Sequence, residues 1–147
     1  MKVLVVLFFL FGGVDSHAPP CLPLYPNADT CKTEKDSLTG RKIYRKVEIE
    51  PECAGGKAEL FRRMNKGLRV PDSALSNEIE SQFIVAFIVE TDGHISSERV
   101  VRGNRQVGQQ ILKVAKSLKW SPGKCYGKNV PVLYTLPMTI DYSEAGN

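Results

Sequence analysis

The residues best suited to chemistry in this 147-residue chain are its four cysteines, Cys21, Cys31, Cys53 and Cys125. An even number of cysteines is typical of disulfides in exported proteins. The sequence therefore predicts two disulfides, for which three connectivities exist. Among these we favour Cys21 with Cys31 and Cys53 with Cys125, because the first pair closes a short local loop.

A metal site is not expected. No two cysteines have the C-x2-C to C-x4-C spacing of zinc ligands. The two histidines are His17, at the end of a predicted signal peptide, and His94, at a predicted turn. We assign neither of them a role and expect neither metal nor cofactor.

Three glutamates alternate at the end of a predicted strand, at Glu48, Glu50 and Glu52. Alternate residues of a strand share a face, where two carboxylates could act as acid and base. A solvated strand face explains the same pattern more simply. No serine or free cysteine has a base near it in the sequence, so we predict no catalytic residue and expect that the protein is not an enzyme.

The chain begins with a pattern typical of export. Lys2 is followed by nine unbroken apolar residues, Val3 to Phe11, and then by small and polar residues. A membrane helix needs about 20 apolar residues, so a cleavable signal peptide over residues 1–18 is favoured over a stable membrane anchor. We therefore expect an exported protein.

The net charge of +4 is a mild excess and argues little for nucleic acid as a partner. Lys113, Lys116 and Lys119 have the spacing of neighbours on one helix surface. An ordinary solvated helix face is our interpretation of these three lysines.

Apolar periodicity divides the rest of the chain. We expect an irregular, proline-containing arm over residues 19–41, a domain over 42–143 and a tail over 144–147. Within the domain, the patterns predict strands at 43–49, 82–90, 95–101 and 130–142, and helices within 55–68 and 106–119.

Asp92 and Gly93 predict a hairpin, and Trp120 is expected to cover the end of the second helix. The predicted fold is a two-layer α+β sandwich, with a small antiparallel sheet covered on one face by two helices.

Three stretches of the chain together resemble the C-terminal domain of the TonB family. These are "EPECAGGKAELFRRMNKGLRVP", "FIVAFIVETDGHISSERVVRG" and "LKWSPGKCYGKNVPVLYTLPMTI". The resemblance covers about 100 residues, and the D-G hairpin followed by W-x-P-G-x-x-x-G is distinctive in combination. Its signature positions are Pro51, Glu52, Gly55, Gly56, Asp92, Gly93, Val100, Val101, Trp120, Pro122, Gly123, Gly127 and Pro137.

The resemblance implies a periplasmic module that binds a segment of an outer-membrane transporter by adding it as a strand beside the last strand of the domain. Family transducers carry a membrane helix and a long proline-rich spacer, which the predicted signal peptide and short arm do not match. The resemblance therefore implies partner binding more than direct energy transduction. It also implies that two copies can exchange strands to form a homodimer.

Two prolines indicate how the last strand meets its neighbours. Pro131 and Pro137 are six residues apart, so their missing N–H groups point to the same side of the strand. We therefore predict an edge strand whose proline side is open and whose other side pairs with the hairpin. The expected partner-binding residues are Val132, Leu133, Tyr134, Thr135 and Leu136.

The alternative function is a secreted, disulfide-stabilised interaction or inhibitor protein that is unrelated to energy transduction. This alternative also explains the predicted export signal and disulfides, but it gives no reason for the D-G and W-x-P-G motifs.

Overall fold

The computed structural model describes residues 30–69 and 82–140. The predicted signal peptide at 1–18, Cys21 and the predicted tail at 144–147 lie outside the described residues. The helices are α1 (Gly56–Gly67) and α3 (Arg105–Ser117). The strands are β1 (Lys32–Lys35), β2 (Lys42–Lys46), β3 (Glu52–Cys53), β4 (Gln82–Val89), β5 (Ile95–Arg102), β6 (Trp120–Ser121), β7 (Gly123–Cys125), β8 (Lys128–Val130) and β9 (Val132–Thr139).

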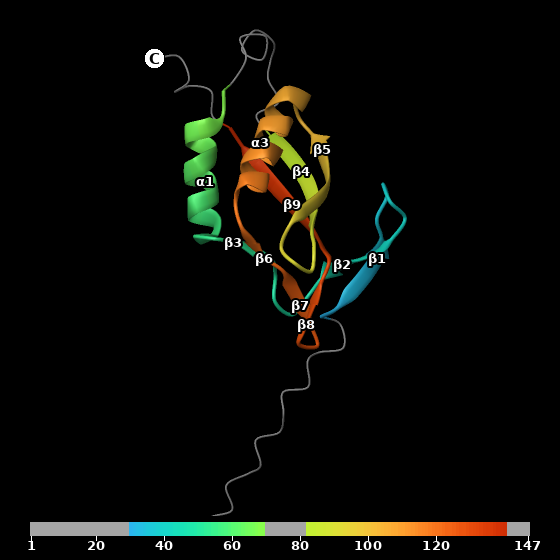
Figure 1. Ribbon diagram of the computed structural model, residues 1–147. Helices are drawn as coiled ribbons and strands as arrows, with labels where there is room; N and C mark the ends of the chain where they lie inside the picture. Colours follow the sequence, from blue (N-terminus) through green and yellow to red (C-terminus); the bar gives the residue numbers. More distant parts are fainter. Residues whose placement is uncertain (1–29, 70–81, 141–147) are drawn as a thin grey trace, which may run out of the picture.

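The main sheet has five strands in the order β1-β2-β9-β4-β5 (Figure 1). Its pairs are antiparallel except β2 with β9, which are parallel and meet at the single register pair Tyr44 and Val132. Two short pairs, β3 with β6 and β7 with β8, lie outside this sheet. The predicted α+β class is confirmed, whereas the prediction of a wholly antiparallel sheet is wrong at the β2 and β9 pair.

The core lies between the helices and one face of the sheet. Alternate residues of β4 and β9 point to this face because successive side chains of a strand alternate. They form one buried cluster with the apolar stripes of both helices, whose largest fully buried members include Phe83, Phe87, Leu60, Met64 and Ile111. A Cβ atom on Gly108 would lie 2.5 Å from Val100 Cγ2, so this glycine lets α3 approach β5 closely.

Ion pairs of two buried carboxylates, Asp36 and Glu90, attach the hairpin of β1 and β2 to β5 and to the turn between β4 and β5. The Asp36 carboxylate accepts hydrogen bonds from the Thr39 N–H (3.0 Å) and hydroxyl (2.7 Å) and pairs with Arg99 of β5 at 3.2 Å. Arg41 pairs with Glu90, which also accepts a hydrogen bond from Ser96. These contacts hold residues of the expected irregular arm against the domain, and the arm contains the regular strand β1.

The structure corrects the predicted disulfides. Cys31 is bonded to Cys125, across 94 residues, while Cys53 is a buried free thiol. Both favoured pairs, Cys21 with Cys31 and Cys53 with Cys125, are therefore wrong. Burial raises the pKa of Cys53, and its thiol donates to the Gly56 carbonyl at 3.1 Å, so Cys53 is a packed core residue.

Replacing Cys31 and Cys125 together by serine should lower the free energy of unfolding by about 4 kcal/mol, because the bond closes a long loop in the unfolded chain. Urea denaturation of the oxidised wild type and the double variant measures this difference. Peptide mapping without reduction should recover Cys31 linked to Cys125 and Cys53 as a thiol. A linked peptide that joins Cys53 to Cys125 would contradict the assignment.

Candidate functional site

The last strand, β9, does not lie at the edge of the sheet. It is third in the strand order, between β2 and β4, so the prediction of an edge strand is wrong. The predicted pairing with the hairpin is confirmed, because β9 pairs with β4 continuously from Val132 to Thr139. Its other side meets β2 only at Val132.

The backbone on this second side belongs to the odd-numbered residues of β9. The Tyr44 N–H donates to the Pro131 carbonyl at 2.9 Å, which shows that Pro131 faces β2. Backbone groups of alternate residues point to the same side of a strand, so Leu133, Thr135 and Pro137 face that side too. Within the described residues, no strand pairs there with the stretch Thr135–Thr139, which we call the open stretch of β9.

A hollow of about 360 Å³ lies where the open stretch begins. It is lined by Arg45, Glu50, Pro51, Lys57, Leu133, Tyr134 and Thr135. The hollow therefore lies between the end of β2, the segment before β3, the first turn of α1 and the first half of β9. The hollow and the open stretch share Thr135, so a segment laid along the open stretch would reach the hollow at that residue.

Two aromatic side chains, Phe87 and Trp120, pack against Tyr134, which lines the hollow. The Tyr134 ring stacks on Phe87, with centroids 5.4 Å apart, and meets the edge of Trp120 at 5.1 Å. Trp120 is buried and its Nε1–H donates to the Ala115 carbonyl at 2.9 Å, as expected for an indole that covers the end of the second helix. The ring of Tyr134 therefore has little freedom to move.

Charges of both signs border the hollow. Burial raises the pKa of Glu50, and the nearby Lys57 opposes this shift. Burial, together with the charges of Cys53, Glu50 and Glu52, raises the pKa of Tyr134. Tyr134 is therefore a neutral hydroxyl at ordinary pH that can donate or accept a hydrogen bond.

The five predicted binding residues differ in their exposure. Val132 and Leu136 are buried in the core, so they support the site and cannot meet a partner through their side chains. Leu133 and Tyr134 are half-buried, and Thr135 is exposed. Arg45, Pro51 and Lys57 were not predicted as site residues. Pro51 is a signature position of the family resemblance, whereas no sequence signal indicates Arg45 or Lys57, because they reach the hollow only through the fold.

The other candidate residues do not assemble into a catalytic site. Glu48 accepts a hydrogen bond from the Tyr126 N–H at 2.9 Å, Glu50 lines the hollow, and Glu52 pairs in register with Ser121. His94 is exposed at the predicted hairpin turn and contacts Asp92. Across residues 30–69 and 82–140, no three His, Cys, Asp or Glu side chains lie close enough to hold a metal ion.

Neither helix in this part of the chain is long and apolar enough to cross a membrane.

Comparison with protein-family models and with curated proteins finds no match to this chain.

Ionisation of Tyr134 should cost stability, because burial disfavours the charged phenolate. Its folded pKa lies above the unfolded value of 10.0, so the free energy of unfolding should fall as pH rises through and beyond 10. Denaturant titrations at pH 8 to 11 should show a smaller fall for Tyr134→Phe than for the wild type. Equal falls in the two proteins would contradict this assignment.

Proposed function

We propose that the chain is a periplasmic, TonB-like protein-binding module that engages a segment of an outer-membrane transporter by β-strand addition, in TonB-linked transmembrane transport. The observation that carries this proposal is the open stretch Thr135–Thr139 beside a half-buried tyrosine and a hollow. The order of strand, helix, hairpin, helix and strand supports a TonB-like arrangement of the domain.

Backbone bonding alone is a weak source of affinity for such a partner. The open stretch offers the carbonyls of Thr135, Pro137 and Thr139 but only the N–H groups of the two threonines. At roughly 0.5 to 1.5 kcal/mol net per bond, five bonds contribute roughly 2.5 to 7.5 kcal/mol. Association costs roughly 4 to 15 kcal/mol, so the partner also needs side-chain contacts, for which Leu133, Tyr134 and the hollow are placed.

The edge strand β5 is a poorer template for strand addition. Its pairing with β4 has two register irregularities, and Ser97 has a positive φ of 51°. Bulges of this kind twist an edge away from incoming strands. Its charged residues Glu98 and Arg99 are engaged with Lys116 and Asp36. The open stretch of β9 has a continuous register with β4 and is the more regular template.

We propose no catalytic activity, cofactor or nucleic-acid partner. A homodimer formed by strand exchange remains part of the proposal, because the open stretch would accept a strand from a second copy as readily as from a transporter.

The alternative is a secreted interaction or inhibitor protein unrelated to energy transduction. The disulfide between Cys31 and Cys125 fits both functions, because the periplasm and the extracellular space are both oxidising. A photo-reactive amino acid at Thr135 distinguishes the two functions in cells. The transporter function predicts cross-links from position 135 to an outer-membrane transporter and few from the same group at Val101 on β5. Cross-links only to extracellular proteins would favour the alternative.

Replacing Thr135 by proline should weaken binding of the cross-linked partner segment by on the order of 1 to 3 kcal/mol, because it removes a donor that the partner needs. The N–H of Thr135 points away from β4, so the fold should survive the change. Calorimetry with a synthetic peptide of the cross-linked segment measures the affinity, and circular dichroism checks the fold.

The matched control is Thr135→Ala, which removes the same side chain but keeps the N–H. It should bind within about twofold of the wild type, because the proposed bond uses only the backbone. If the folded proline variant binds as tightly as the alanine variant, the open stretch is not the binding site.

A further inference from the structure

Positive charge is concentrated on the two helices. Together α1 and α3 carry seven basic side chains and a single acidic one, Glu59. The helices alone therefore hold more net positive charge than the whole chain, whose net charge is +4. An uneven distribution of this kind indicates a surface for an anionic partner.

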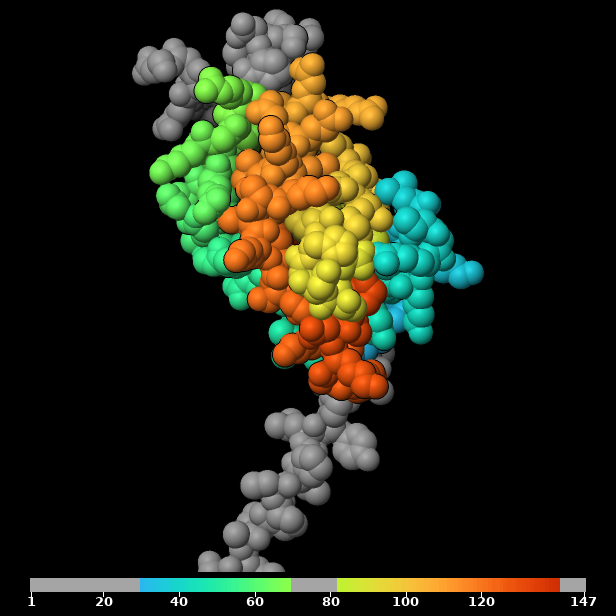
Figure 2. Space-filling view, in the orientation of Figure 1, coloured from blue at the N-terminus to red at the C-terminus, as the bar shows by residue number. Residues whose placement is uncertain are grey.

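The two helices form one continuous face. The Gln110 side chain accepts from the Arg69 N–H and donates to the Arg69 carbonyl, both at 2.8 Å, which joins the end of α1 to α3. Figure 2 shows α1 in green beside α3 in orange on the face toward the viewer. We call this surface the basic face; its exposed cations are Arg62, Arg63, Lys66, Lys113, Lys116 and Lys119.

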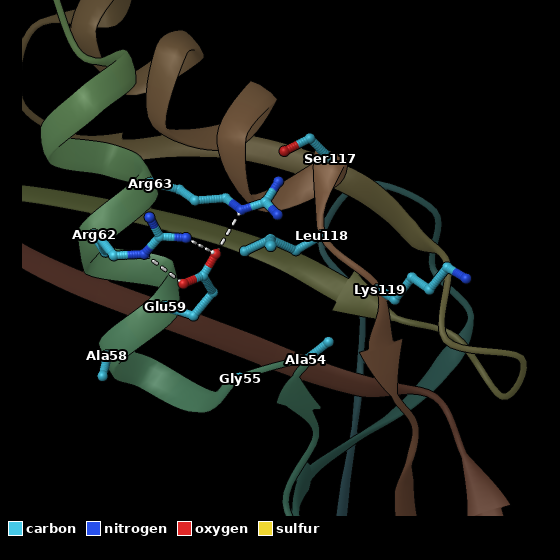
Figure 3. A pocket seen from close by; sticks show the side chains of 9 residues that line it. All are labelled: Ala54, Gly55, Ala58, Glu59, Arg62, Arg63, Ser117, Leu118 and Lys119. Carbon is cyan, nitrogen blue, oxygen red and sulfur yellow. Dashed lines mark hydrogen bonds and ion pairs between the residues drawn. The ribbon is translucent and has the colours of Figure 1, made fainter.

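A hollow of about 650 Å³ opens in the basic face, between the first turns of α1 and the C-terminal end of α3 (Figure 3). Its polar lining is Glu59, Arg62 and Arg63 from α1, and Ser117 and Lys119 from across the gap, so three cations outnumber one carboxylate. The hollow is wide enough for a small anionic group and is bordered by cations on both sides.

Glu59 orients the two arginines and uses only some of their hydrogen-bond donors. Its carboxylate accepts from Arg62 Nε and Nη2 at 2.7 Å each and from Arg63 Nε at 2.8 Å. These bonds lower the pKa of Glu59 to about 2, so it stays ionised at ordinary pH. A guanidinium has five N–H donors, and Arg63 uses one of them here, so it can still bind a phosphate in bidentate geometry.

We propose that the basic face docks on an anionic phospholipid membrane and that the hollow receives a lipid phosphate. The cations are spread over both helices, which suits a surface with many negative charges better than a single small ion. Clusters of basic residues on a helix surface are typical of proteins that bind anionic lipid headgroups.

Flotation of the full chain with vesicles tests the proposal. Binding is expected to vesicles of phosphatidylcholine with phosphatidylglycerol, to fall as salt is raised, and to be absent from phosphatidylcholine alone. The variant Arg63→Gln, Lys113→Gln, Lys119→Gln should bind roughly 100-fold more weakly, because each lost charge near an anionic surface costs about fivefold.

The matched control is Lys35→Gln, Lys42→Gln, Lys46→Gln, which removes the same charge from exposed positions of the β1 and β2 hairpin. It should bind vesicles within about threefold of the wild type. An equal loss in both triple variants would overturn the proposal, since net charge and not the basic face would then govern binding. Equal binding to neutral vesicles would also overturn it.

Two competition experiments distinguish membrane binding from binding to other molecules that carry phosphate. Inorganic phosphate at millimolar concentration should leave the protein on the vesicles; full displacement would make the hollow a site for free phosphate. A DNA duplex that binds more tightly than the vesicles, with the same dependence on Arg63 and Lys113, would assign the face to nucleic acid and overturn the membrane proposal.

Discussion

The packing of Trp120 between the helices and the sheet is the contact on which the rest of the structure depends. The indole lies edge-on to Phe87 of β4, with ring centroids 5.3 Å apart, and contacts Tyr134 of β9. Its Nε1–H donates to the Ala115 carbonyl in the last turn of α3, which also accepts from the Leu118 N–H at 3.3 Å. One side chain thus sets the position of α3, β4 and β9 relative to one another, and both proposed binding surfaces follow from that arrangement.

The prolines of β9 act together with β2 to restrict strand addition. Pro131 uses its carbonyl to bond Tyr44 of β2, and Pro137 interrupts the donors further along the same side. A long unpaired strand is a template for aggregation, and natural sheets limit such edges with prolines, bulges and charges. Here β2 covers the beginning of the strand and Pro137 divides the remainder, so a partner must fit a short stretch with few donors.

Most of the regular elements could be predicted because each has a local cause. The stripe of α3 and the continuous apolar run of β4 are periodic in the sequence, and Asp92 and Gly93 form the expected turn between β4 and β5. The strands that prediction missed have weak periodicity or few residues. β1 is four residues long with exposed or half-buried side chains, and β3 and β6 are two residues each, so only their neighbours make them strands.

The sequence by itself determined the α+β class, the two helices, the hairpin and the side of β9 to which the prolines point, because these depend on spacing within short segments. Only the tertiary structure decided that Cys31 bonds Cys125, since the ends of a 94-residue loop meet through the packing of every element between them. It also decided that β2 lies beside β9 and that Arg45 and Lys57 border the same hollow. A parallel neighbour can come from any distant part of a chain, and no local pattern specifies which one arrives.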